Sequence, residues 1–159
     1  MANHSDLTDP ELHEPKGIAA ATSGQVYVAD GAASGAFSLY PWANVSGKKV
    51  ALTVTIDNIS TAGQVYVVSP FTGTISRVYS VINGAIGTAD ATLTPKIAGV
   101  AVTDGAITVA FSGSAAGDVD SSTPTAANTI TAGAAIEIET DGASTNTVQC
   151  FVTLEITLT

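Results

Sequence analysis

The sequence predicts an all-β protein, a jelly-roll-like β-sandwich with an extended N-terminal arm. Ala, Gly, Thr, Val and Ser are plentiful while Leu, Lys, Arg and Glu are scarce, a bias that disfavours long helices and suits strands with tight turns. Several short runs alternate apolar and polar residues and are separated by Gly, Asp, Asn or Pro. A length of 159 residues suits one compact domain plus an arm.

The arm and attachment extension is expected to occupy residues 1–47, before a sandwich over residues 48–159. Residues 1–15 contain four acids, two prolines and almost nothing apolar, so we expect this segment to order only on a partner. Residues 17–47 are rich in Ala, Gly and Ser and contain one short apolar stretch at 25–28. The aromatic side chains in this part, which we expect to anchor the extension, are Phe37, Tyr40 and Trp42.

The first strand of the sandwich is predicted from residue 48 onward. Val50, Leu52, Val54 and Ile56 alternate with polar or small residues, which is typical of a half-buried strand. Further strands are predicted over residues 65–68 and 73–82, the latter ending at the turn pair Asn83-Gly84.

Residues 100–109 predict a β-hairpin. Two β-rich runs flank Asp104-Gly105, a pair that favours a two-residue primed turn. That turn places Val102 opposite Ile107 and Val100 opposite Val109, so apolar residues share one face.

The remaining chain is predicted to be a long loop followed by two strands. Residues 113–133 are polar and turn-rich, with room for a brief strand at Thr129-Ile130. Alternation returns over residues 135–140 and is strongest over residues 148–158. Counted together, these patterns predict seven or eight strands after residue 48. The phrase Gly-Gln-Val-Tyr-Val occurs at 24–28 and again at 63–67, which similar strand chemistry is enough to explain.

Charge and composition exclude several kinds of partner. The formal net charge is −9, from 5 basic and 14 acidic residues, so we expect no binding to nucleic acid or anionic lipid. No apolar run approaches the roughly 20 residues that cross a bilayer, and the first residues lack a signal-peptide pattern, so we expect a soluble chain made in a cytoplasm. Charged residues are only 12% of the chain, which leaves neutral surface for contact with other proteins.

Candidate catalytic groups all have simpler structural interpretations. Both histidines, His4 and His13, lie in the arm, far in sequence from the nucleophiles of the domain. Cys150 falls on the apolar face of a strand, which predicts a small buried hydrophobe rather than a reactive thiol. Glu137 and Glu139 share one strand face and are expected in solvent. The sequence therefore predicts no enzyme.

Ligand sites are weakly indicated. Asp118 and Asp120 form the nearest approach to a calcium loop, but the other ligands of such a loop are missing, so two turn-forming aspartates are the favoured interpretation. No Gly-rich phosphate loop precedes a helix, and we expect no cofactor and no bound metal. Phe37, Tyr40 and Trp42 leave sugar stacking open as an alternative to anchoring.

Several segments resemble proteins of tailed-bacteriophage virions. Residues 13–18 and 24–31 are similar to the N-terminal segment of such proteins. Residues 70–75, 90–94 and 99–103 are similar to the β-domain of phage head decoration, cement or head-fibre proteins. The resemblance implies a homotrimer on the outer capsid surface at local three-fold positions, with the N-terminal segment reaching across major capsid protein subunits.

The expected function is to decorate and stabilise the capsid by bridging major capsid protein subunits. An alternative is a tail-fibre or receptor-binding module that touches host glycans through the loop at 113–133. Residues assigned to contact with the capsid or a neighbouring subunit are His13, Glu14, Pro15, Lys16, Tyr27, Phe37, Tyr40 and Trp42.

Overall fold

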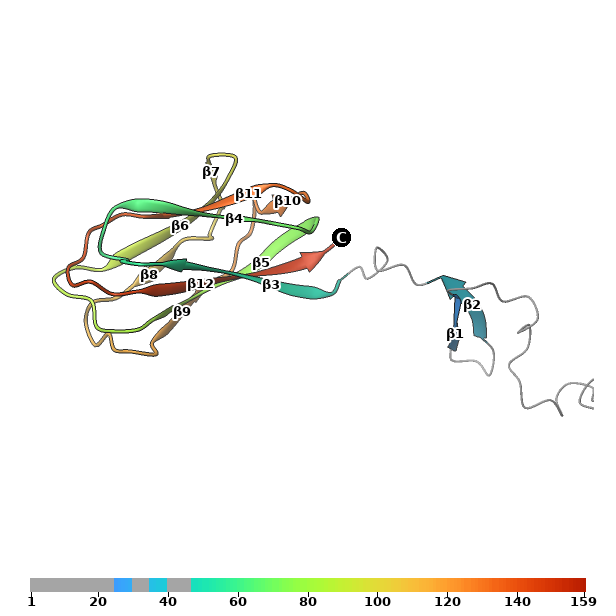
Figure 1. The fold of residues 1–159 in the computed structure, drawn as a ribbon, viewed down its shortest axis with the longest axis horizontal. Helices are drawn as coiled ribbons and strands as arrows, with labels where there is room; N and C mark the ends of the chain where they lie inside the picture. The colour runs from blue at the N-terminus through green and yellow to red at the C-terminus, as the bar shows by residue number, and fades with distance from the viewer. Residues whose placement is uncertain (1–24, 30–34, 40–46) are drawn as a thin grey trace, which may run out of the picture. The chain divides into compact units, whose positions relative to one another are not determined.

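A computed structural model describes residues 47–159 in full and the backbone of residues 25–29 and 35–39. The chain divides into two compact units, Met1–Val45 and Ser46–Thr159. In the first unit, β1 (Gln25–Ala29) and β2 (Gly35–Leu39) pair as antiparallel strands (Figure 1). A two-stranded ribbon of this length is marginal in water by itself, so its stability depends on further packing.

The second unit is a sandwich of two five-stranded antiparallel sheets, which confirms the predicted all-β sandwich (Figure 1). The described residues contain no helix, and therefore none that is long and apolar enough to span a membrane. We name the two sheets after β12 and β11, a central strand of each. The β12 sheet contains β3 (Lys49–Ile56), β5 (Gly73–Ile82), β9 (Val119–Ser122), β10 (Thr129–Ile130) and β12 (Cys150–Leu158). The β11 sheet contains β4 (Gly63–Val68), β6 (Ala91–Ile97), β7 (Val100–Ala101), β8 (Ile107–Val109) and β11 (Ala135–Thr140).

The hydrophobic core lies between the two sheets and follows the period-two pattern of the strands. On β12, every second residue from Cys150 to Ile156 is fully buried, and on β11 the buried isoleucines are Ile136 and Ile138. Fully burying one such aliphatic side chain stabilises the fold by about 1.5–3 kcal/mol. The alternation seen in the sequence is therefore what holds the two layers together.

Most predicted strands are confirmed. Strands occupy 73–82 and 135–140 with the predicted bounds, and the brief strand at Thr129-Ile130 is present as β10. The final strand begins at Cys150, two residues later than predicted. The predicted long loop at 113–133 also contains β9, and β6 lies where no strand was predicted, so the unit has ten strands rather than seven or eight.

The predicted hairpin at 100–109 is wrong in its turn and its pairing. The reversal lies at Ala98-Gly99, where φ is +50° and +78°, and β7 folds back on the end of β6. β8 continues along the same strand, with Val109 opposite Ala91. The chain bulges outward between β7 and β8. Opposite this bulge, Pro95 on β6 has no N–H to donate, and its carbonyl accepts the Val102 amide at 2.9 Å. Asp104-Gly105 makes the turn within that bulge.

Candidate interaction surfaces

The predicted contact residues fall mainly outside the part that the structure describes. His13, Glu14, Pro15, Lys16, Tyr40 and Trp42 lie outside the described residues. The two others belong to the N-terminal strand pair, where Tyr27 on β1 is the cross-strand partner of Phe37 on β2. The structure thus brings together two of the eight residues, as backbone neighbours.

The outer face of the β12 sheet carries an apolar row that the sequence predictions missed. The register aligns Phe151, Val81 and Val119 across three adjacent strands, with Thr55 next to Phe151 on β3. Phe151 is 37% exposed and Val119 is 63% exposed. The signal was available in the alternation, because Phe151 occupies an outward position of the strongest predicted strand. Such a row is suited to contact with another protein surface.

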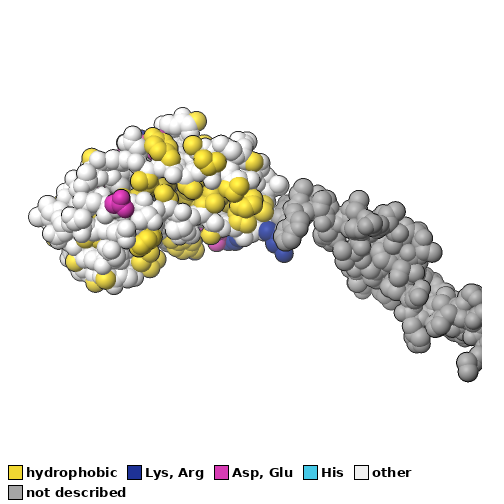
Figure 2. Space-filling view, in the orientation of Figure 1, with side chains coloured by type: hydrophobic (Ala, Val, Ile, Leu, Met, Phe, Trp, Pro, Cys, Tyr) yellow, Lys and Arg dark blue, Asp and Glu magenta, His cyan; other side chains and the backbone are white. Residues whose placement is uncertain are grey.

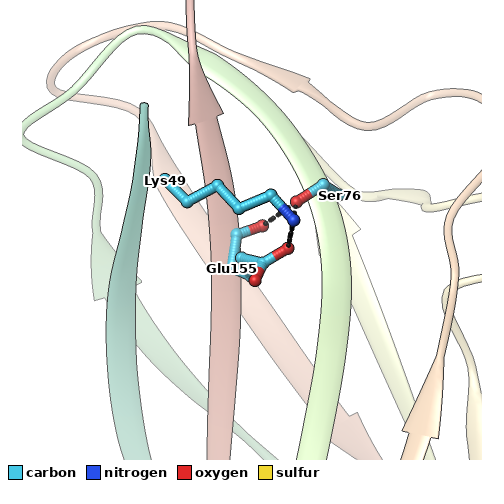
Figure 3. A network of polar contacts seen from close by, with 3 residues as sticks. All are labelled: Lys49, Ser76 and Glu155. Carbon is cyan, nitrogen blue, oxygen red and sulfur yellow. Dashed lines mark hydrogen bonds and ion pairs between the residues drawn. The ribbon is translucent and has the colours of Figure 1, made fainter. Parts of the chain in front are cut away.

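A polar network lies on the same face, nearer the start of β3 (Figure 3). The Lys49 ammonium donates to Glu155 Oε1 at 2.8 Å, and the Ser76 hydroxyl lies 2.8 Å from the same oxygen. The hydrogen bond from Lys49, then the one from Ser76, lowers the pKa of Glu155. Beside them the Arg77 guanidinium lies 5.6 Å from the ring centre of Tyr79, within cation–π range. This part of the face is therefore charged but internally paired.

The outer face of the β11 sheet combines an ion pair with exposed apolar side chains. Lys96 Nζ lies 2.7 Å from Glu139 Oε2, and this hydrogen bond is the main cause that raises the pKa of Lys96. Glu137 is half-buried beside them and Glu139 is paired, so the predicted solvated pair is only partly in solvent. On the neighbouring strand β4, Tyr66 and Val68 are each 58% exposed.

The side of the sandwich between β3 and β4 is incompletely covered. We call this the open side and define it by Val50, Leu52, Val54, Val65 and Val67, which face the core but are only partly buried. Figure 2 shows hydrophobic side chains gathered around β4 and between it and β3. At one end of the open side, a hollow of about 290 Å³ is lined by residues that include Ile56, Val65 and Ile138.

The opposite side is closed by the segments that follow β7 and β9, and we call it the sealed side. The Thr103 amide donates to Ala126 O at 3.0 Å, and Ser122 Oγ donates to Gly105 O at 2.8 Å. The Asn128 side-chain amide donates to Ile75 O at 2.9 Å. The first two bonds join segments of the two sheets across this side, whereas the third holds the segment before β10 against β5 within the β12 sheet.

The thiol and carboxylate groups that the sequence singled out occupy structural positions. Cys150 is fully buried as predicted, and burial raises the pKa of its thiol to about 11, which keeps it protonated and unreactive. Asp118 Oδ2 accepts the Ala115 amide at 2.7 Å, so it is a turn-forming aspartate, and burial raises the pKa of its neighbour Asp120. Within the described residues, no three His, Cys, Asp or Glu side chains gather as metal ligands.

Comparison with known proteins yields structural likeness alone. No family model matches the sequence, and neither does any curated protein. Among solved structures, one similar chain comes from a study titled "Bacillus endospore appendages form a novel family of disulfide-linked pili". It shares 17% identity and a TM-score of 0.30, over 70% of this chain and 88% of that chain.

Proposed function

We propose that this chain is a non-enzymatic virion protein that decorates a tailed-bacteriophage capsid and stabilises it by bridging major capsid protein subunits. The observation that carries the proposal is the outward placement of bulky apolar side chains on both sheets. Tyr66, Val68 and Val119 are each more than half exposed, in a chain with few charged residues. Apolar surface of this kind suits lasting contact with other protein rather than free diffusion.

The N-terminal unit is the proposed attachment element. Residues 13–18 and 24–31 carry the resemblance to phage virion proteins, and the acidic first segment is too polar to form a core by itself. Each attachment adds buried area between capsid subunits, which opposes expansion of the shell. Because many copies act on one shell, each contact can be individually weak.

The direct test is binding of the labelled full-length chain to undecorated capsids. Removal of residues 1–45 is expected to abolish binding while circular dichroism still reports a folded sandwich. Thr108→Lys, which alters an exposed polar position of the sandwich and leaves the arm intact, serves as the comparison and is expected to bind. Unchanged affinity of the truncated chain would assign attachment to the sandwich instead.

A second candidate is a tail-fibre or receptor-binding module, favoured by a polar hollow of about 160 Å³ beside the loop at 113–133. Its lining includes Ser112, Asp118 and Asp120, and the adjoining Phe111 is 45% exposed. Carboxylates beside an exposed aromatic ring are the groups that hold a sugar. Binding on a glycan array, together with location on the tail by cryo-electron microscopy, would favour this function over decoration.

A further inference from the structure

The edge strand β3 has the features of a strand that pairs with another chain. It lies at the end of the β12 sheet and pairs with β12 over eight consecutive residues without a register shift. Soluble proteins usually block such an edge with charges, proline or a bulge. Between Val50 and Ile56, β3 has no charged residue and no proline. Within the described residues, this edge is therefore regular and uncharged from Val50 to Ile56.

The open side gives this edge an apolar lining. Val50, Leu52 and Val54 on β3 face the core yet are only partly buried. Val65 and Val67 on β4 are also partly buried core-facing residues. Two copies with a net charge of −9 each repel one another over most of their surface. The repulsion is weakest where acidic residues are absent, and neither β3 nor β4 contains one. A second copy can thus approach most closely along this side.

The residues at the two ends of β3 are complementary to those of a second β3. When two β3 strands run antiparallel with Thr53 opposite Thr53, Lys49 stands opposite Asp57 of the other copy, and Leu52 stands opposite Val54. The Lys49 side chain is 61% exposed although its ammonium is paired with Glu155 at 2.8 Å, and Asp57 is exposed, so a second copy can reach both. The contact is the same from both copies, as a twofold axis requires.

We propose that two copies of this chain pair through β3, antiparallel and centred on Thr53. The pairing joins two β12 sheets into one continuous sheet, covers the half-buried side chains of the open side, and forms two Lys49–Asp57 ion pairs. This inference is independent of the proposed function. It also differs from the threefold assembly that the resemblance implies, so the mass of the particle separates the two.

Sedimentation of the full-length chain over a range of concentrations tests the proposal. We expect a species of twice the 15.8 kDa chain mass. Asp57→Lys and Lys49→Glu each place like charges opposite one another and should raise the dissociation constant at least tenfold. An equimolar mixture of these two variants should regain the pair, because each supplies the charge that the other needs. The double variant Thr108→Lys/Thr129→Lys makes the same charge change as Asp57→Lys at exposed positions on β8 and β10, and should pair as the unaltered chain does.

Three results would overturn the proposal. The first is a single-chain or three-chain mass at all concentrations. The second is pairing by Asp57→Lys equal to that of the double control, or no recovery on mixing. The third is a loss of pairing in Val26→Lys as great as in Asp57→Lys, which would show that β1 of a neighbouring copy occupies the edge.

Discussion

The open and sealed sides of the sandwich differ in how they cover the outermost side chains of the core, which both sides border. On the sealed side, the segments that contain β9 and β10 bring backbone and side-chain hydrogen bonds across the gap, as between Thr103 and Ala126. On the open side, β3 and β4 leave valines partly exposed with no charge between Val50 and Ile56 to deter another strand.

The core is covered by segments of the same chain on the sealed side, whereas the open side is where a second copy would bind in the proposed pairing. The sealed side uses local hydrogen bonds whose loss weakens the folded unit. In the proposed pairing, the open side contributes surface that a second copy would cover. Substitutions on the two sides should therefore change different measured quantities, stability in one case and assembly in the other.

The largest effect on stability is expected from Gly142→Ala at the end of the open side. Gly142 has a φ of +67°, and a Cβ there would meet the backbone of Ala62, with Cα only 2.8 Å away. We expect a loss of about 3 kcal/mol or more, because the clash with backbone adds to the strain of a left-handed alanine. Thermal unfolding measures it. Gly113→Ala, at φ +83° with open space around it, isolates the strain and should lose only about 1 kcal/mol. Equal losses would show that Ala62 does not confine this turn.

A smaller loss is expected from Asn128→Ala on the sealed side. The change removes the side-chain donor to Ile75 O and should lower the free energy of unfolding by about 1–2 kcal/mol. Denaturant titration provides the value. Gln64→Ala, on the exposed face of β4, should stay within about 0.5 kcal/mol. If Asn128→Ala were as mild as this control, the segment before β10 would owe little of its attachment to β5 to this hydrogen bond.

Ser80→Ala is expected to stabilise the fold. Ser80 is buried on β5, and its hydroxyl finds no hydrogen-bond partner among the described residues. Removing an unpaired buried hydroxyl should add about 1 kcal/mol in thermal unfolding. Thr140→Ala is the matched contrast, since its buried hydroxyl donates to Thr61 O at 2.6 Å. That variant should be less stable, and a gain there would undermine the reasoning for Ser80.

The smallest effect near neutral pH is expected from Cys150, on the strand between the two sides. Burial raises the pKa of its thiol from 9.0 to about 11, so the folded chain keeps a proton that the unfolded chain releases. Stability should be unaffected below pH 9 and should fall as the pH rises from 9 toward 11. Comparison with Cys150→Ala separates this fall from the titration of Lys and Tyr. The same slope in both proteins would contradict a protonated thiol.

The sequence was informative wherever alternation alone determined the structure. Strands such as β5, β11 and β12 follow from period-two patterns whose apolar residues enter the core. The burial of Cys150 followed for the same reason. The strand pairing was harder to predict from the sequence. Asp104-Gly105 satisfies the rule for a hairpin turn, but the chain reverses at Ala98-Gly99. Pro95 on β6 accepts the Val102 amide through its carbonyl, a contact that a local sequence pattern does not contain.

The candidate surfaces were harder to predict than the strands. Tyr66 lies in a segment predicted as an ordinary strand and Val119 in one predicted as a loop, and only the register shows the sheet face to which each belongs. The open side is likewise a property of strand order, since β3 and β4 become edges only after the two sheets are assembled. Of the predicted contact residues, Tyr27 and Phe37 alone lie in described strands, and their role in attachment remains a prediction.

Oxidative cross-linking of Thr53→Cys tests the pairing of β3 most directly. Residues directly opposite in an antiparallel pair have Cα atoms about 4.5–5.5 Å apart, within the range that a disulfide spans. Thr53 is opposite itself in the proposed pair, so this variant should form a covalent dimer under mild oxidation. Thr55→Cys, two residues along the same exposed face, would stand opposite Ala51 and should remain largely uncrosslinked. Efficient cross-linking of Thr53→Cys alone is the predicted result, and failure to link, or equal linking of both variants, would contradict the twofold pairing.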